Sequence, residues 1–201
     1  MTANKERTKS EAKTQAILKA AIAEFLKNGY AVTSMDKVAK RAQVSKATVY
    51  SHFGDKKSLF NAVMKDLVKD KFQTVMGLES PQSLERDPKV VLSEIAHRVL
   101  TNASQDLNFQ NLIRVIVGES GRFPELAKAY VNYLAKPAIE TLNRYFQSHP
   151  EIELQDPEAT VRVMMGSLTY FIILQEMMYG KEIVPLEEDR LVQTLIDSIL
   201  K

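Results

Sequence analysis

The segment from Thr33 to Phe60, TSMDKVAKRAQVSKATVYSHFGDKKSLF, constrains the fold of this chain more than any other part of its sequence. Its apolar spacing and cap residues predict two short helices and, directly after them, the start of a third. Gln43 and Val44 form the tight turn between the two short helices. This pattern is typical of a helix-turn-helix, in which the second short helix meets a nucleic acid duplex.

The second short helix is expected over residues 46–53 and has two chemically different faces. Ser45 precedes it and is a suitable N-cap. Val49 and Phe53 are apolar and are expected to pack inward. The other face carries side chains that can donate to phosphates or touch base edges, and these are Lys46, Thr48, Tyr50, Ser51 and His52. Any one of them alone would more often be an ordinary surface or core residue, but the whole set on one face favours DNA binding.

Helix starts near this segment supply further candidate phosphate contacts. Free backbone amides at a helix N-terminus favour an anion. Thr33 and Ser34 stand at the start of the first short helix, and Lys56 stands at the start of the third. We therefore expect these three residues to add phosphate contacts to those of the second short helix.

Positive charge is concentrated in the same region of the chain. Residues 1–59 contain 12 Lys and Arg against 5 Asp and Glu, whereas the remaining residues contain 15 against 20. A basic N-terminal part fits a polyanionic partner. Chance clustering of charge on a solvated surface is the alternative interpretation.

Helical periodicity dominates the whole chain. No run of alternating β-branched residues predicts a sheet, so we expect an all-α fold. Asp87 and Asp156 each precede a proline and mark two helix starts. Pro137 should kink its helix, because it removes a backbone donor and its ring crowds the preceding turn. Outside the helix-turn-helix, helices are expected over about residues 10–29, 56–78, 88–102, 106–119, 124–147, 156–180 and 186–200, with a polar connection over 79–88.

The composition argues against several classes of function. The chain has no cysteine, so it has no disulfide, thiolate metal site or cysteine nucleophile. Its three histidines do not stand at metal-ligand spacing and no glycine-rich phosphate loop is present, so we expect no metal, no cofactor and no enzyme. The polar N-terminus lacks a signal core and no apolar run is long enough to span a bilayer. We therefore expect a cytoplasmic, nucleoid-associated protein without a membrane partner.

The residues from about Ser10 to Phe60 resemble the N-terminal domain of the TetR family of bacterial transcription regulators. The matching features are the first helix AILKAAIAEFLKNGY, the TSMDKVAKRA opening, VSKATVYSHF and the GDKKSLF continuation. The resemblance implies an all-helical, usually dimeric protein that binds a palindromic operator and is released from it by an effector. It also implies that the DNA-contacting positions are Lys46, Ala47, Thr48, Tyr50, Ser51, His52 and Lys56. Gln43 stands where the family often has glycine, and we expect it to adopt a left-handed conformation at modest cost.

The later sequence, with VIVGESGRFPELAKAYVNYLAKPAIETLNRYF, resembles the AcrR-like and AefR-like branch of the same family. We therefore expect a helix-turn-helix DNA-binding domain over residues 1–56 and a helical effector-binding and dimerisation domain over residues 57–201. The resemblance implies a repressor that binds a double-stranded DNA operator as a homodimer. A chromosome-organising protein on the same fold, without small-molecule control, is the alternative.

Two C-terminal helical patterns predict the dimer interface. Residues 161–178 are apolar around most of the helical circumference, which requires cover from both sides. The protein's own domain supplies one cover and a second copy is the simplest source of the other. The last helix has a matching apolar stripe. The expected interface is a four-helix arrangement that comprises Val161, Leu168, Ile172, Ile173, Met177, Leu191, Leu195 and Ile199. The alternative is that both helices are ordinary core of a monomer.

Aromatic and methionine side chains of the middle helices are candidates for an effector pocket. Methionine adapts to varied apolar ligands, so the expected effector is small and apolar or amphipathic. The candidate pocket residues are Phe72, Met76, His97, Phe109, Ile113, Tyr133 and Met165. Core packing is the alternative role for each of them.

Overall fold

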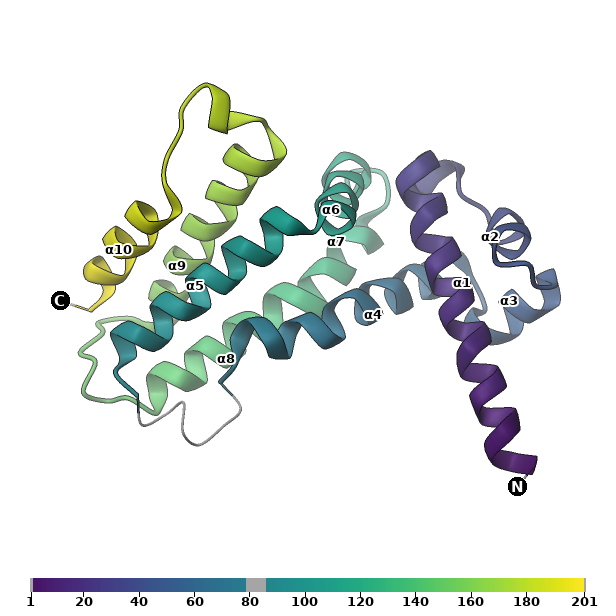
Figure 1. Cartoon of the computed structure of the whole chain (residues 1–201), viewed down its shortest axis with the longest axis horizontal. Coiled ribbons are helices and arrows are strands. Elements are labelled where there is room, and N and C mark those ends of the chain that lie inside the picture. The colour runs from purple at the N-terminus through teal and green to yellow at the C-terminus, as the bar shows by residue number, and fades with distance from the viewer. Residues whose placement is uncertain (1, 79–85, 201) are drawn as a thin grey trace. The chain divides into compact units, whose positions relative to one another are not determined.

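The computed structural model describes residues 2–78 and 86–200, without the side chains of residues 2–9, 70, 71, 73 and 74. Every regular element in these ranges is helical, which confirms the predicted all-α fold (Figure 1). Most of the connection predicted over residues 79–88 lies outside the described residues. The elements are α1 (Thr2–Val32), α2 (Met35–Ala42), α3 (Lys46–Phe53), α4 (Lys56–Met76), α5 (Pro88–Gln105), α6 (Leu107–Glu119), α7 (Pro124–Tyr130), η2 (Val131–Ala135), α8 (Lys136–Gln147), α9 (Pro157–Phe171), η3 (Ile172–Met177), η4 (Gly180–Glu182) and α10 (Glu188–Ile199).

Local sequence signals place several helix starts correctly. Ser34 caps α2 and Ser45 caps α3, and each side chain accepts a hydrogen bond from an amide of the first turn. Asp87 and Asp156 cap α5 and α9 in the same way, each directly before a proline. Gln43 ends α2 in a left-handed conformation with φ 55° and ψ 39°. The predictions for Ser45, Asp87, Asp156 and Gln43 are confirmed.

The helix α1 is longer than predicted. It begins at Thr2 and not near residue 10, and Gly29 interrupts it with φ 74° and ψ 171°. The first residues of the chain are polar and lack apolar spacing, so the pattern gave no sign that the helix covers them. After the break at Gly29, residues 30–32 form a short turn that leads into α2.

Wider π-helical turns interrupt both of the long helices predicted in the second half of the chain. Residues 124–147 form α7, η2 and α8, and Pro137 lies in the first turn of α8, directly after η2. A proline has no amide to donate and its ring crowds the preceding turn, so the wider turn accommodates it where a simple kink was expected. α9 continues into η3, and the chain then turns at Tyr179 and Gly180.

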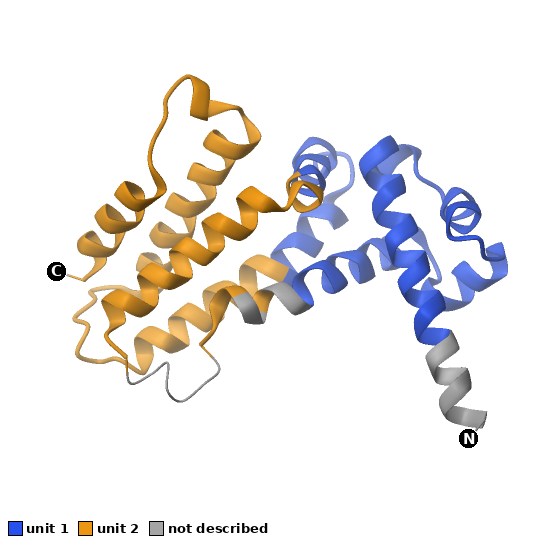
Figure 2. Ribbon diagram, viewed as in Figure 1, with its two compact units in different colours: residues 1–69, 111–133 blue, residues 70–110, 134–201 orange. Residues whose placement is uncertain are grey.

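The chain divides into two compact units, which are coloured separately in Figure 2. Unit 1 comprises residues 1–69 and 111–133, and unit 2 comprises residues 70–110 and 134–201. This division follows contacts within the chain. The predicted boundary after residue 56 separates DNA-binding and effector functions, and it stays a prediction.

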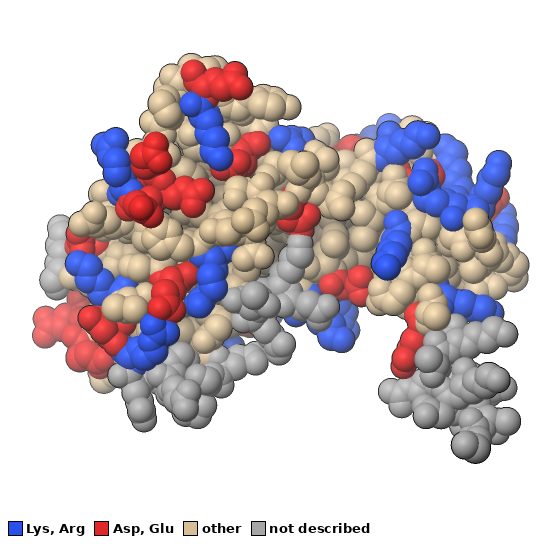
Figure 3. All heavy atoms as spheres, viewed as in Figure 1, with Lys and Arg blue, Asp and Glu red and all other residues tan. Residues whose placement is uncertain are grey.

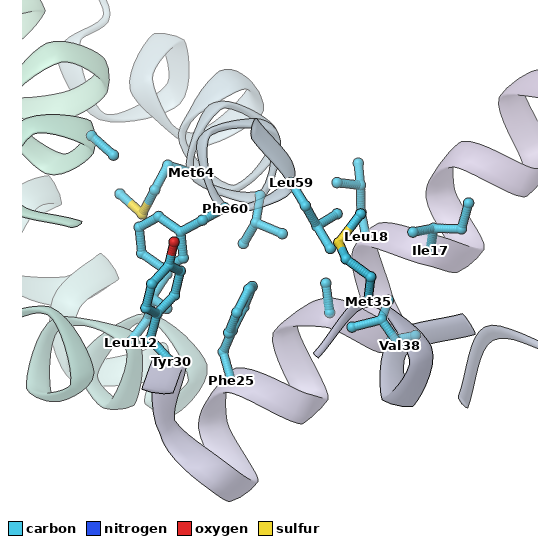
Figure 4. Packing of buried hydrophobic residues seen from close by; sticks show 14 of the residues in the cluster. Ile17, Leu18, Phe25, Tyr30, Met35, Val38, Leu59, Phe60, Met64 and Leu112 are labelled. Carbon is cyan, nitrogen blue, oxygen red and sulfur yellow. The ribbon is translucent and has the colours of Figure 1, made fainter. Parts of the chain in front are cut away.

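The core of unit 1 is built from helices that are far apart in the sequence. In Figure 4, the rings of Phe25 and Tyr30 lie against that of Phe60, with centroids 5.3 and 5.5 Å from it, respectively. Val38 of α2 and Val49 of α3 are fully buried in the same core. α6 and α7 also contribute to it, through Leu112, Ile116, Leu126 and Ala129. The helix-turn-helix is therefore supported by a segment from the second half of the chain, which the sequence pattern did not indicate.

The core of unit 2 joins α5, α8, α9 and α10. Its fully buried side chains include Leu92 and Leu142. The same core contains four of the residues predicted at the dimer interface, and these are Val161, Leu168, Leu195 and Ile199. They are covered within one chain because they lie on the inward faces of α9 and α10. A helix that is apolar on all sides must be covered on both sides. Its sequence does not show which residues face the protein's own domain and which face a second copy.

We expect Gly29→Ala to destabilise unit 1 by roughly 1–3 kcal/mol, because alanine resists a φ of 74°. Its added Cβ would also lie 2.5 Å from Oε1 of Glu119. Gly121→Ala is the matched control in the same unit, since φ at Gly121 is not in the left-handed region and its Cβ would meet nothing within 4 Å. Urea denaturation should separate the two variants, and equal stabilities would contradict this account of Gly29.

Candidate nucleic-acid interface

The geometry of α2, the turn and α3 is set by hydrogen bonds local to the segment. The amide of Gln43 bonds to the carbonyls at the end of α2, and the amide of Val44 donates to the carbonyl of Ala39 at 3.1 Å. Ser45 then accepts from the amide of Thr48 at 3.1 Å and begins α3. These bonds satisfy backbone groups that would otherwise be left open at two helix ends. The segment is therefore an ordered helix-turn-helix.

α3 has the two faces that its sequence predicts. Val49 is fully buried, and Phe53 is partly buried against the core of unit 1. The other predicted contact residues of α3 lie at least partly in solvent, with Lys46, Ala47, Tyr50 and Ser51 exposed and Thr48 and His52 half-buried. The structure thus brings this set together on one accessible face of a single short helix.

Lys46 and Tyr50 are the members of this face best placed to reach a ligand. The ammonium of Lys46 bonds to the carboxylate of Asp36 at 2.9 Å, which raises the pKa of Lys46, and it lies 5.8 Å from the centroid of the Tyr50 ring. Both members of this ion pair are largely exposed. An exposed pair is weak and readily exchanged for a phosphate. Lys46 is therefore charged and available.

The remaining polar side chains of α3 already make bonds within unit 1. The hydroxyl of Ser51 donates to the carbonyl of Thr48 at 2.9 Å, and the hydroxyl of Thr48 lies 2.8 Å from that of Ser45. Nδ1 of His52 lies 3.2 Å from the hydroxyl of Thr14 on α1. These bonds hold the side chains in defined orientations, which favours a specific surface over a loose one.

Two of the predicted phosphate contacts are engaged inside the protein. Thr33 is only 2% exposed, and its hydroxyl donates to the carbonyl of Gly29 at 2.7 Å. The ammonium of Lys56 donates to three backbone carbonyls, those of Tyr30, Thr33 and Ala31, at 2.8, 3.0 and 3.3 Å. Burial lowers the pKa of Lys56. The structure gives these two residues a structural role, while Ser34 remains exposed at the start of α2.

We expect Lys56→Met to destabilise the protein by about 1–3 kcal/mol, because it leaves three carbonyls without their charged donor. Lys57→Met removes the same charge from the next residue, whose side chain is exposed, and is the matched control. In thermal denaturation, only Lys56→Met should have a clearly lower melting temperature than the wild-type protein. Equal melting temperatures would contradict the structural role of Lys56.

A second candidate site is a cavity of about 590 Å³ in unit 2. The end of α4 and the residues after it form one wall, and α8 forms the other. Its lining consists of Phe72, Met76, Gly77, Leu78, Pro137, Glu140, Thr141, Arg144, Tyr145 and Ser148. Only Phe72 and Met76 of the seven predicted effector residues are among them.

The other predicted effector residues lie elsewhere. Nε2 of His97 is 3.7 Å from the carboxylate of Asp189, and both residues are solvent-accessible. Ile113 and Tyr133 pack against the core of unit 1, and Met165 packs against the core of unit 2. Phe109 is half-buried in α6. The structure therefore does not gather these five side chains around the cavity.

The predicted dimer residues that keep some exposure are Ile172, Ile173, Met177 and Leu191. More strongly exposed apolar side chains occur on α9 and on the segment that follows it, and these are Val163, Tyr170, Met178, Tyr179, Ile183 and Val184. The structure thus leaves an apolar surface on α9 and the α9–α10 connection.

No group of histidine, aspartate or glutamate side chains in the described part of the chain has the arrangement of a metal site. None of the helices formed by residues 2–78 and 86–200 combines the length and apolar character that crossing a bilayer requires.

The fold and the α3 face define a helix-turn-helix regulator. Residues 17–63 match the bacterial regulatory proteins of the tetR family, and residues 90–201 match the C-terminal domain of the AefR-like transcriptional repressors. The chain belongs to the TetR family. It is therefore a DNA-binding transcriptional repressor and not an enzyme, and regulators of this family are dimers.

Individual relatives agree with this family over most of the chain. The HTH-type transcriptional regulator YhgD of Bacillus subtilis is 27% identical over 161 residues, which cover 79% of this chain and 77% of that protein. The crystal structure of a TetR-family transcriptional regulator from Mesorhizobium loti is 25% identical, has a TM-score of 0.76 and covers 95% of this chain and 96% of that one. The Flavonoid-responsive Regulator FrrA is also 25% identical, with a TM-score of 0.71 and 94% of each chain covered.

Proposed function

We propose that this protein represses transcription by binding a palindromic operator as a homodimer and that a small-molecule effector releases it. The observation that carries the proposal is the accessible face of α3, which presents Lys46 and Tyr50 while Val49 anchors the helix in the core. Figure 3 shows Lys and Arg side chains gathered over the part of the molecule formed by α1 to α3. Such a basic surface favours the phosphate backbone of DNA.

The proposed DNA contacts are those predicted side chains that solvent can reach. Ser34 at the start of α2 would contact phosphate, and α3 would lie in the major groove. The residues of α3 in the proposed interface are Lys46, Ala47, Thr48, Tyr50, Ser51 and His52. Thr33 and Lys56 would not contact DNA themselves. They would support these residues by holding the connection into α2.

We propose that a second copy of the chain covers the apolar surface on α9 and the α9–α10 connection. A single α3 reads only a few base pairs, whereas a twofold dimer doubles the contacts and requires two half-sites in inverted order. Val163 is 59% exposed and Tyr170 is 65% exposed, so a partner could cover both without any rearrangement of the unit 2 core. Residues 57–201 would thus supply dimerisation, and residues 1–56 would supply DNA binding.

The cavity in unit 2 is the proposed effector site. Its apolar wall comes from Phe72 and Met76 of α4 and from Leu78 after that helix. Arg144 and Ser148 supply polar groups at its exposed edge. This combination suits an amphipathic ligand. FrrA, a structural neighbour, is a flavonoid-responsive regulator, and a ligand of similar chemistry is the effector class that we propose.

Selection of bound sequences from random duplexes tests the proposed function. We expect an inverted repeat whose half-sites are separated by one helical turn or a multiple of it. Locating that repeat at a few promoters would support a repressor that acts on the bacterial nucleoid in the cytoplasm. A site spread broadly over the genome would favour the chromosome-organising alternative.

A further inference from the structure

The end of α1 after its break at Gly29, together with Thr33, forms the connection to α2 (residues 29–33), and charged groups hold this connection from two sides. Residues 29–33 leave the regular helix at Gly29 and end at the buried Thr33, directly before the cap of α2. On one side, the ammonium of Lys56 donates hydrogen bonds to three of its carbonyls. On the other side, the carboxylate of Glu119 accepts hydrogen bonds from two of its amides. Both backbone surfaces of the connection are therefore bound by charged side chains from distant parts of the chain.

Glu119 binds both amides with separate oxygens. The amide of Tyr30 donates to Oε1 at 2.7 Å, and the amide of Ala31 donates to Oε2 at 2.9 Å. These amides follow the helix break at Gly29, and a bidentate carboxylate is a strong acceptor for such a pair. Gly29 has no side chain, which leaves room for Oε1 at this point.

Neighbouring side chains of the same turn strengthen this contact. Phe123 lies edge-on to Tyr30 with ring centroids 5.1 Å apart, and the hydroxyl of Tyr30 donates to the carboxylate of Glu125 at 3.2 Å. Glu119 is the last residue of α6, and α6 begins in unit 2 and ends in unit 1. The last residue of α6 therefore binds the backbone that leads into α2.

We propose that Glu119 is a positioning residue for DNA binding: its two hydrogen bonds set the connection between α1 and α2, and through it the placement of the helix-turn-helix. The inference rests on the proposed function and adds to it the specific contact that links α6 to the DNA-binding helices. Release of the two amides would let α2 and α3 shift together, since the connection enters α2 directly. A shift of both α3 helices in a dimer changes the half-site spacing that the dimer fits.

The effect of Glu119→Gln on charge and its effect on hydrogen bonding change DNA affinity in opposite directions. Glu119→Gln removes a negative charge, and this alone would strengthen the binding of DNA. The amide of glutamine offers only one acceptor to the two backbone amides. If Glu119 positions the helix-turn-helix, the variant should bind DNA more weakly in spite of its more favourable charge.

The experiment measures binding of two duplexes, the sequence selected by the wild-type protein and the same half-sites with one base pair added between them. We expect Glu119→Gln to bind the selected duplex at least tenfold more weakly and to discriminate less between the two duplexes. The amides of Tyr30 and Ala31 should exchange with solvent at least tenfold faster. Glu153→Gln is the matched control, because it removes the same charge from an exposed residue of the loop between α8 and α9. It should not weaken binding of the selected duplex, reduce discrimination between the duplexes or speed the exchange of the two amides.

Glu119→Asp keeps the charge but shortens the side chain by one methylene, which moves the carboxylate away from the two amides. This variant is the second test and replaces Glu119→Gln if that variant does not fold. We expect it to be folded and to lose discrimination in the same direction. A folded variant of either kind with wild-type affinity and wild-type spacing discrimination would overturn this inference alone. A wild-type protein that binds no selected duplex would overturn the proposed function, and this inference with it.

Discussion

Replacing Lys46 with alanine is expected to weaken operator binding by about 30-fold or more, because a dimer loses the same contact twice. Lys46 is exposed at the start of α3, and its partner Asp36 is exposed as well. Without the lysine, the carboxylate of Asp36 would face DNA with its charge uncompensated. The ion pair lies on the surface and contributes little to stability, so the melting temperature should hardly change. Fluorescence anisotropy with the selected duplex measures the effect.

Lys128→Ala is the control for this prediction. Lys128 is an exposed lysine of unit 1 that lies on α7 and outside the helix-turn-helix. Its removal changes the net charge by the same amount and should reduce affinity only slightly, through long-range electrostatics. Equal losses of affinity for both variants would show that the general charge of unit 1, and not the face of α3, binds DNA.

Val163→Glu is expected to convert the dimer to monomers and to weaken operator binding by at least about 100-fold. The side chain is 59% exposed in the single chain, so the fold of one chain tolerates a carboxylate there. In an apolar interface the two carboxylates would be desolvated without partners, which opposes association strongly. Each monomer keeps one α3, but it loses the doubled contact that a palindromic operator offers.

Sedimentation equilibrium measures this effect, with Val90→Glu as the control. Val90 is also an exposed valine in a helix, at 44% exposure, but it lies on α5. We expect Val90→Glu to remain dimeric. A dimeric Val163→Glu protein would reject this surface as the interface. A charged residue at Leu195 would be a poorer test, because Leu195 is buried in the core of unit 2 and its replacement would disrupt the single chain.

The parts of the fold that follow from local chemistry could be predicted from the sequence. Ser34 and Ser45 are caps because their side chains bond to amides within the next turn. Gln43 takes the left-handed conformation that the turn between α2 and α3 requires. The two faces of α3 follow from its spacing of three and four residues. Each of these features is decided by residues close together in the chain.

The contacts between distant segments could not be predicted in this way. Glu119 stands in the sequence as an ordinary glutamate near a glycine turn, and only the fold brings it to Tyr30 and Ala31. Lys56 has the sequence position of a phosphate contact, yet its ammonium bonds to carbonyls at the end of α1. Such roles depend on tertiary packing, for which one sequence carries no periodic signal.

The C-terminal helices show the same limit for apolar residues. α9 is apolar around much of its circumference, and its pattern does not separate Val161, which is buried in unit 2, from Val163, which is exposed. The sequence also does not separate pocket residues from core residues, because aromatic and methionine side chains occur both in packed cores and around cavities. Phe72 and Met76 line the cavity, whereas Ile113 lies against the core of unit 1.

We expect α3 to read the sequence of double-stranded DNA. The most direct test is the affinity of the purified protein for the duplex obtained by selection, compared with a scrambled duplex of the same composition, at several salt concentrations. We expect the selected duplex to bind about 1,000-fold or more tightly than the scrambled one at physiological salt, and both affinities to fall as salt rises. Equal affinity for the two duplexes, or no binding to either at low ionic strength, would contradict the claim.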